Sequence, residues 1–476
     1  MAAFRTQGRF TPGNGASAES NGRWSNTWTN WAGNVTSRPR SVETPSTPLA
    51  LMRVLDRAIA QGETLRVVGA GHSFTPAAAT NGVQISLDNF DQLESIVPIE
   101  GTNGEALVTV GAGIRLHVLN RVLAENGLAM PNLGDIDHQS IAGALGTGTH
   151  GTGAKLTGLA AQVRGMRILL ASGDVVETSP THNSQLFKAA QVSLGAIGIV
   201  LAVTMRCVPA FLLHARETPM ALGQVLENLD GPGNFADSND HFEFYWFPGT
   251  QGTLAKFNNR VEPGTKASTE DLNPAAALAR SARFWVDDEL LSNGLFQLTN
   301  SISARVPALT PPINVIASKV LSAREYIAPS HEVFISPRRV RFVEMEYAIP
   351  REALKDTLQE FMTVANRKDL AVQFPIEVRF AAADDVWLST AHERESAYIA
   401  VHQYQHSQYR EYFEAAESIF RAVGGRPRWG KMHTLEHSDL DKLDPQLGEF
   451  TSLRSHYDPK GTFANFYTNQ VFGKAN

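Results

Sequence analysis

An imidazole and two glycines stand close together in residues 67–76, whose sequence is VVGAGHSFTP. Gly69 and Gly71 let the backbone turn tightly and approach a ligand closely. The amides of such a turn form a concavity that suits pyrophosphate oxygens. His72 has no obvious packing role there, so chemistry at the ring has to be considered. Phe74 stands where a Rossmann fingerprint needs its third glycine, and no P-loop motif occurs. A plain structural turn is therefore the alternative.

A second stretch of small residues, 146–153, has the sequence GTGTHGTG, and a third, 193–198, has the sequence SLGAIG. Thr147, Thr149 and Thr152 offer hydroxyl groups, and His150 is the one bulky side chain of the second stretch. Such segments can line a pyrophosphate or a ribose at little steric cost. A glycine-rich surface loop is the alternative for either one alone. Their number in one half of the chain favours an extended dinucleotide.

Charged and aromatic residues alternate along two strand-like segments of the second half. Glu377 and Arg379 alternate within residues 374–380, so they share one face of a strand. A carboxylate and a guanidinium on an otherwise apolar strand are costly to bury unless they are paired or serve a function. A purely structural ion pair is the alternative. His402 and Tyr404 share a face in the same way, and Lys431 follows a proline- and tryptophan-containing turn.

Two pairs of histidines, His402/His406 and His433/His437, have i,i+4 spacing. This spacing favours a metal site only on a helix, and the first pair begins in a strand pattern. No His-Glu-x-x-His motif occurs nearby. We therefore expect no metal, and we interpret His402 as a substrate-facing polar group or proton acceptor.

The elements that carry these residues alternate between short strands and helices. The pattern predicts a helix from residue 48 to about Gly62, strands over 65–68, 83–87 and 106–110, and a helix over 115–126. A hairpin over 166–178 and a strand over 199–205 follow. Composition changes near residue 210. We predict an α+β fold with a disordered tail over 1–28, one domain over 29–210 and another over 211–476. The last ~25 residues are expected to pack back near the cofactor.

Composition narrows the function classes. With 476 residues, 43% hydrophobic and 19% charged, the chain is typical of a globular protein of two or three domains. A net charge of −6 argues against nucleic acid or an anionic membrane as the main partner. The single cysteine, Cys207, excludes a disulfide framework. No apolar run of about 18 residues and no signal peptide occur, so a cytoplasmic location is expected.

Taken in order, these motifs resemble the FAD-binding flavoproteins of the vanillyl-alcohol-oxidase superfamily. Within it the chain is similar to the aldonolactone oxidoreductases, the L-gulono-1,4-lactone and D-arabinono-1,4-lactone oxidases, and to the related alditol oxidases. The resemblance begins at residues 29–34, TNWAGN, and includes the three glycine-rich stretches. It continues through Glu377-Val378-Arg379, residues 429–431 (WGK) and residues 458–465, almost to the C-terminus.

The resemblance implies a two-domain flavoprotein, with an FAD-binding domain and a cap domain of sheet and helices that binds substrate. It implies that His72 carries a covalent link to the flavin 8α-methyl group. Cys207, in an apolar strand, is not expected to form a second link. The cofactor-binding residues that it implies, besides His72, are Val68, Gly69, Ala70, Gly71, Ser73, Gly134, Asp135, Ser140, Gly143, Gly146, Thr147, Thr149, His150, Gly151, Gly198, Ile199 and Lys431.

For catalysis the resemblance implies that Arg379 supplies positive charge to substrate and reduced flavin, and that Glu377 orients a substrate hydroxyl. Lys431 stabilises negative charge on the flavin or contacts the substrate. His402 or Lys431 assists loss of the hydroxyl proton. Relatives usually have histidine where Arg428 stands. The expected reaction oxidises a sugar lactone beside its carbonyl to a 2-keto-lactone, which for L-gulono-1,4-lactone tautomerises to ascorbate.

The residues around position 134 bear on the acceptor and the substrate. In similar proteins a glycine like Gly134 leaves space for O2, although some members with glycine prefer other acceptors. Asp135 and Tyr404 are expected to contact substrate. They favour a lactone over a polyol, because alditol oxidases have serine at the first position and some relatives have threonine at the second. An alditol oxidase and a non-catalytic flavin-binding redox carrier are the alternatives.

Overall fold

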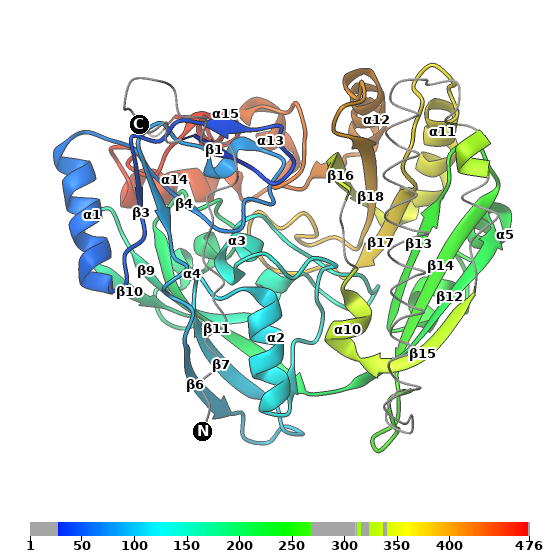
Figure 1. Ribbon diagram of the computed structural model, residues 1–476, viewed down its shortest axis with the longest axis horizontal. Coiled ribbons are helices and arrows are strands. Elements are labelled where there is room, and N and C mark those ends of the chain that lie inside the picture. The colour runs from blue at the N-terminus through cyan, green and yellow to red at the C-terminus, as the bar shows by residue number, and fades with distance from the viewer. Residues whose placement is uncertain (1–26, 269–309, 311, 316–322, 337–339, 475–476) are drawn as a thin grey trace, which may run out of the picture.

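The computed structural model describes residues 27–268, 310, 312–315, 323–336 and 340–474. Two lobes lie side by side, one built from the first two hundred residues and one around a large sheet (Figure 1). Residues 1–26 of the predicted tail lie outside the described residues. Trp28, which that tail also included, pairs with Ser37 in a short two-stranded sheet.

The first lobe holds a three-stranded parallel sheet in the order β3-β5-β4 and a six-stranded antiparallel sheet in the order β10-β9-β11-β7-β6, with β8 joined to β11. The strands are β1 (Trp28–Thr29), β2 (Thr36–Ser37), β3 (Ser41–Glu43), β4 (Leu65–Val68), β5 (Val83–Ser86), β6 (Leu93–Pro98), β7 (Ala106–Gly111), β8 (Leu128–Ala129), β9 (Val163–Leu169), β10 (Val175–Thr178) and β11 (Ile199–Pro209). The helices are α1 (Pro48–Ala60), α2 (Leu116–Glu125), α3 (Ile141–Gly146) and α4 (Ser184–Gln191).

Local sequence explains the first helix. The Thr47 hydroxyl accepts a hydrogen bond from the Ala50 N–H at 3.1 Å, which caps the N-terminus, and Pro48 occupies the first turn, where no amide donor is needed. Leu51 and Leu55 recur on one buried face. Gly62, with φ +65°, follows the end of the helix. The predicted helices over 48–62 and 115–126 and the predicted hairpin are confirmed.

The second lobe is built around an eight-stranded antiparallel sheet in the order β15-β12-β14-β13-β17-β18-β16-β19. Its strands are β12 (Leu212–Ala221), β13 (His241–Trp246), β14 (Gly252–Arg260), β15 (Arg324–Pro329), β16 (Phe342–Pro350), β17 (Ile376–Ala381), β18 (Ser396–Tyr404) and β19 (Arg426–Pro427). Its helices are α5 (Leu222–Glu227), α6 (Phe235–Ser238), α10 (Ser330–Phe334), α11 (Leu354–Ala365) and α12 (Arg410–Ala422).

Alternation along the central strands gives this sheet one apolar and one charged face. On the apolar face, Tyr347 packs against Phe420 of α12, which in turn packs against Phe361 of α11. The opposite face is directed toward the first lobe and carries buried or partly buried ionisable and hydroxyl groups from four strands. They are Glu243, Tyr245, Glu344, Glu346, Glu377, Arg379 and His402.

The C-terminal helices α13 (His437–Leu443), α14 (Leu447–Tyr457) and α15 (Phe466–Phe472) lie with the first lobe, near α1 and β4 (Figure 1). Arg66 on β4 donates a hydrogen bond to the Phe463 carbonyl at 2.6 Å, and the Leu65 N–H donates to the Thr462 carbonyl at 2.7 Å. Asp458 in turn accepts hydrogen bonds from the Thr462 and Phe463 amides. The first lobe is therefore completed by residues from the far end of the sequence.

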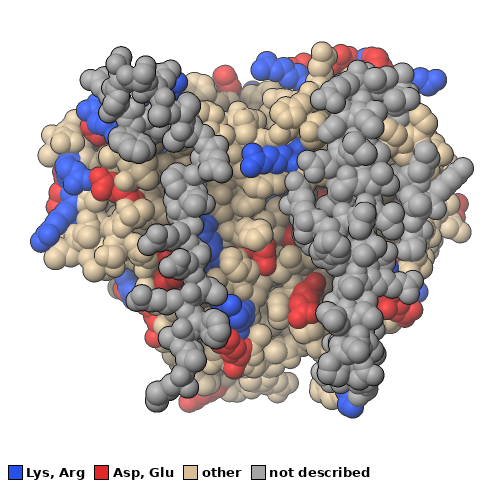
Figure 2. All heavy atoms as spheres, viewed as in Figure 1, with Lys and Arg blue, Asp and Glu red and all other residues tan. Residues whose placement is uncertain are grey.

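Acidic and basic side chains are interspersed over the face of the molecule seen in Figure 2, with no large area of one sign among the atoms that it colours. Among the helices of the described residues, none combines the length and the apolar composition needed to cross a bilayer.

Candidate active site

A cavity lined by small residues lies in the first lobe, where β4, α3 and the turn before β11 meet. We call it the glycine-lined cavity; about 1030 Å³ of space here, part of it open solvent, is not filled by protein atoms. Twelve of the residues expected to bind cofactor line it together. They are Val68, Gly69, Ala70, Gly71, His72, Ser73, Ser140, Gly143, Gly146, Thr147, Gly198 and Ile199.

Close backbone approach explains why these segments need glycine. A Cβ atom on Gly69 would lie 2.4 Å from the Ser140 hydroxyl oxygen, and one on Gly143 would lie 2.9 Å from it. Ser140 caps α3 by accepting the Gly143 N–H. Gly71 has φ +68°, a conformation that side-chain-bearing residues rarely adopt. The turn and the start of α3 are thus packed together at a distance that excludes side chains.

A second cavity adjoins the first and shares His72, Ser73, Gln139 and Thr147 with it. We call it the charged cavity. Besides the shared residues, five further predicted residues line it: Gly134, Asp135, Thr149, His150 and Lys431. Trp31 and Arg428 also line it, and no role at the site was predicted for either.

His72 stands where the two cavities meet. Its ring stacks on Trp31 at 5.5 Å between centroids and lies 6.3 Å from the His138 ring at an interplanar angle of 11°. The sequence alone suggested no packing role for this imidazole. The structure corrects that view, because the ring lies between two other rings that define its orientation.

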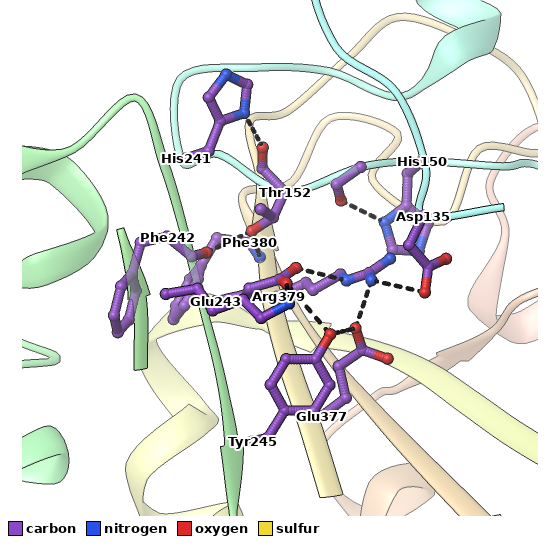
Figure 3. A network of polar contacts seen from close by, with 12 residues as sticks. Asp135, His150, Thr152, His241, Phe242, Glu243, Tyr245, Glu377, Arg379 and Phe380 are labelled. Atoms are coloured by element: carbon purple, nitrogen blue, oxygen red, sulfur yellow. Dashed lines mark hydrogen bonds and ion pairs between the residues drawn. The ribbon is translucent and has the colours of Figure 1, made fainter. Parts of the chain in front are cut away.

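Arg379 is the centre of a buried network of carboxylates (Figure 3). Its guanidinium lies 3.2 Å from Asp135 Oδ2 and 3.0 Å from Glu243 Oε2, and it also contacts the Glu377 carboxylate. The Tyr245 hydroxyl lies 2.7 Å from Glu377 Oε1 and 3.1 Å from Glu243 Oε1. Asp135 connects this network to the charged cavity, since it alone of these residues lines the cavity.

The network keeps its cation charged. Burial alone would lower the pKa of Arg379, but the carboxylates of Glu377, Asp135 and Glu243 raise it well above its ordinary value. Burial would raise the pKa of Glu243, whereas Arg379 and Lys256 lower it, so this carboxyl stays ionised. Arg379 is therefore a fixed positive charge surrounded by acceptors.

A second set of ion pairs is built on β16. Glu344 contacts the Lys431 ammonium and lies 3.4 Å from His402 Nε2. Two residues along the same face, Glu346 lies 2.7 Å from Arg428 and 2.9 Å from His150 Nε2. Each glutamate thus holds one cation and one imidazole.

These glutamates are ionised despite their burial. Burial would raise the pKa of Glu344, but Lys431 and His402 hold it at about 2. Arg428 and His150 likewise overcome burial and place the pKa of Glu346 well below its ordinary value. Burial lowers the pKa of Lys431, and Glu344 opposes this effect. The lysine therefore gives up its proton more readily than an exposed lysine.

Several predicted residues do not reach either cavity. His402 is 5% exposed, packs edge-on against Phe342 and lies 3.4 Å from Glu344, and it lines neither cavity. Tyr404 packs in the apolar cluster around Phe342. Gly151 is a packing residue, because a Cβ atom there would lie 2.3 Å from Asn132 Oδ1.

Sequence reasoning missed Glu243, Tyr245, Glu344 and Glu346 as site residues, and left the role of Arg428 open. The available signal was the same one that identified Glu377 and Arg379: polar residues at alternate positions of an otherwise apolar strand. Residues 242–247 (FEFYWF) and 343–347 (VEMEY) both carry it.

FAD fits the glycine-lined cavity. Glycine backbone and the hydroxyl groups of serine and threonine are part of its lining. They are the donors that a pyrophosphate and a ribose require. Residues 39–179 match a family model described as an FAD binding domain, and residues 203–471 match the model for D-arabinono-1,4-lactone oxidase. The second match covers more than half of the chain. The chain belongs to the D-arabinono-1,4-lactone oxidase family.

The sequence similarity to individual relatives extends along almost the whole chain. It is 38% identical to an L-gulono-1,4-lactone dehydrogenase of Mycobacterium tuberculosis over 94% of this chain and 99% of that protein. It is 32% identical to an L-gulonolactone oxidase of Bos taurus over 93% of this chain and 97% of that protein. The chain is an FAD-dependent oxidoreductase of the aldonolactone oxidase and dehydrogenase class.

The same fold is known from solved structures. Cholesterol oxidase from B. sterolicum superimposes with a TM-score of 0.74 over 96% of this chain and 99% of that chain, at 16% identity. At that identity the likeness concerns the fold alone. The prediction of an α+β, two-domain flavoprotein is confirmed.

Proposed function

We propose that the protein oxidises L-gulono-1,4-lactone or a close aldono-1,4-lactone at its C2 hydroxyl, giving a 2-keto-lactone. The main observation behind this proposal is that the charged cavity adjoins the glycine-lined cavity and shares His72 with it as a lining residue. The activities for which the M. tuberculosis and B. taurus relatives are named support the lactone as substrate. FAD, when bound, supplies the acceptor for the hydride that leaves C2.

The residues in and beside the charged cavity bind the substrate and accept its proton. Asp135 accepts a hydrogen bond from a substrate hydroxyl, and Arg379 holds Asp135 and Glu377 in place. Lys431 Nζ, in its neutral form, takes the proton of the oxidised hydroxyl, and Glu344 stabilises the ammonium that results. Lys431 replaces His402 in this role because it lines the cavity and His402 does not.

The charge balance supports an uncharged substrate. Asp135, Glu243 and Glu377 surround the guanidinium of Arg379, and Lys256 lies 3.6 Å from Glu243, so these three carboxylates outnumber the two cations beside them. An aldonate, the ring-opened acid, would place a further carboxylate beside them. The intact lactone avoids that repulsion.

We further propose that the flavin is linked covalently to His72 alone. The ring is held at the junction of the cavities, which supports attachment there. Cys207 supports no second link, because it is 1% exposed on β11 and burial raises the pKa of its thiol to about 12. Acid precipitation tests this proposal: the yellow colour should stay with the pellet, and a colourless pellet would disprove the link.

The substrate is tested by anaerobic bleaching of the bound flavin. L-gulono-1,4-lactone should bleach the spectrum, whereas xylitol and L-gulonate should not. Bleaching by xylitol would indicate an alditol oxidase, and the absence of bleaching by any lactone or polyol would indicate a redox carrier. Bleaching of the flavin by L-gulonate would refute the argument that the carboxylates of the site repel a charged substrate.

We propose O2 as an acceptor, alongside other acceptors, from the glycine at position 134. A Cβ there would lie 3.1 Å from the Thr149 methyl group and from the His150 carbonyl oxygen, so an added methyl group would displace this wall of the charged cavity. Reoxidation in air after anaerobic reduction should be slower in Gly134→Ala than in the wild type. Equal rates would refute a role for Gly134 in oxygen access.

A further inference from the structure

Three potential metal ligands lie together outside both cavities. One ligand atom each from His117, Asp137 and His138 lies within 4.8 Å of the other two. His117 belongs to the first turn of α2, and the other two residues precede α3. We propose that these side chains bind a divalent transition-metal ion such as Zn²⁺. No sequence motif predicts the site, because twenty positions separate His117 from Asp137.

The backbone holds the two segments together without a metal. The His117 N–H donates a hydrogen bond to the Asp137 carbonyl at 2.9 Å, and the Leu116 N–H donates to the Gln139 carbonyl at 2.9 Å. Arg115 and Ser140 form a β-bridge beside them. The donors are therefore positioned by the fold, and metal binding does not have to order a loop.

The His117 ring is oriented for coordination, and the exposed His138 ring has room to turn toward it. His117 Nδ1 lies 3.2 Å from the Asp137 carbonyl oxygen, which suits an Nδ1–H donor and leaves the lone pair on Nε2. Histidine ligands commonly donate their second N–H to a carbonyl in this way. The imidazoles of His117 and His138 lie 5.6 Å apart at 63°. His138 Nε2 is 4.0 Å from Asp137 Oδ1, and its side chain is 72% exposed, so rotation of this ring can close the site.

The ligand set selects the class of ion. Two imidazole nitrogens and one carboxylate oxygen favour Zn²⁺, Ni²⁺, Co²⁺ and Cu²⁺ over Mg²⁺ and Ca²⁺, which prefer oxygen. The neighbouring cation, Arg115, is paired with Asp88 and does not occupy Asp137. Solvent exposure leaves the remaining coordination positions to water.

The site lies next to the junction of the cavities. The His138 ring lies 6.3 Å from the His72 ring and nearly parallel to it, so a metal on His138 would be one ring away from His72. A bound ion is therefore expected to fix His138 against His72. A paramagnetic ion there would also quench light emission from a flavin held at His72.

Titration calorimetry of the FAD-loaded protein, prepared without an affinity tag, tests the proposal. Zn²⁺ should bind with a stoichiometry of one, and His117→Ala and His138→Ala should each weaken binding at least tenfold. Asp137→Asn should weaken it to a similar degree. His182→Ala, which removes an exposed histidine elsewhere, should leave binding unchanged. Absence of saturable heat in the wild type, or unchanged binding in both histidine variants, would overturn the proposal.

A second measurement checks the position of the site. Cu²⁺ should quench flavin emission in the wild type and in His182→Ala, but several-fold less in His117→Ala. Since melting temperature reports folding separately, a folded His117→Ala variant that is quenched like the wild type would place the bound ion elsewhere and refute the site.

Discussion

Tyr245 has one hydroxyl proton and two carboxylates within reach, at 2.7 Å and 3.1 Å. Burial and the charges of Glu243 and Glu377 raise its pKa well above the ordinary value, so the phenol remains a donor. We predict that Tyr245→Phe lowers kcat/KM about tenfold, because the loss of one hydrogen bond frees Glu377 to move relative to Arg379. Anaerobic flavin reduction by the lactone measures this effect.

Tyr347 provides a matched control on the opposite face of the same sheet, where its hydroxyl donates to the buried Glu417. Tyr347→Phe should lower the melting temperature and leave the kinetic constants unchanged. If both variants affected only stability, Tyr245 would have no role in the site.

Lys431 determines the expected pH dependence. If neutral Nζ accepts the substrate proton, kcat rises with pH through the pKa of Lys431, which burial places below its ordinary value of 10.5. Glu344→Gln removes the anion that raises this pKa, so the rise should move to lower pH. Lys431→Met should abolish it and lower kcat by about 10²–10³. A kcat that falls with increasing pH would show that the charged form acts.

The sequence predicted ion-paired residues well where both members of the pair lie on one strand. Glu377 and Arg379 could be paired from their alternation, whereas Glu243 lies 136 positions from Arg379 and Arg428 lies 82 from Glu346. Such partners meet only through the order of strands in the sheet, which no local pattern encodes. The strand and the face of His402 were predicted correctly, but its ring packs against Phe342 and Glu344 and does not line the charged cavity.

At the scale of elements, the turn after β4 and the start of α3 form one unit. Local signals predicted the helices over 48–62 and 115–126, since caps and glycines mark their ends. The short α3 and the largely exposed β6 were missed, because neither has a long apolar period. The contact between Gly69 and Ser140 likewise depends on tertiary structure.

We predict that Gly69→Ala reduces the FAD content of the purified protein. The added methyl group would lie 2.4 Å from the Ser140 hydroxyl oxygen and would separate the turn from α3. The ratio of flavin to protein absorbance measures the content. Gly223→Ala in α5, where a Cβ atom meets no neighbour within 4 Å, should retain wild-type content. Full FAD occupancy in Gly69→Ala would contradict the proposed packing.

At the scale of the molecule, the first lobe depends on residues from the far end of the sequence. Asn465 Nδ2 lies 2.8 Å, 3.2 Å and 2.9 Å from the carbonyl oxygens of Pro76, Ala77 and Ala79, and its side chain also caps α15. We predict that Asn465→Ala costs about 1–3 kcal/mol of unfolding free energy and releases FAD or reduces its uptake.

Asn259→Ala is the control in the second lobe, since it removes hydrogen bonds to Asp240 and Asn239. It should lower the melting temperature without lowering FAD content. Equal loss of FAD in both variants would mean that general stability, rather than the contact at residues 76–79, controls retention.

The bond from Arg66 to the Phe463 carbonyl spans 397 positions of sequence, and this sets an order of events during biosynthesis. At a translation rate of about 5–20 residues per second, β4 leaves the ribosome on the order of half a minute before its partner exists. The wall beside the glycine-lined cavity is thus unfinished until residue 463 has left the ribosome. We expect the cofactor to be captured after that point, and a nascent chain that stalls before residue 463 should accumulate without its flavin.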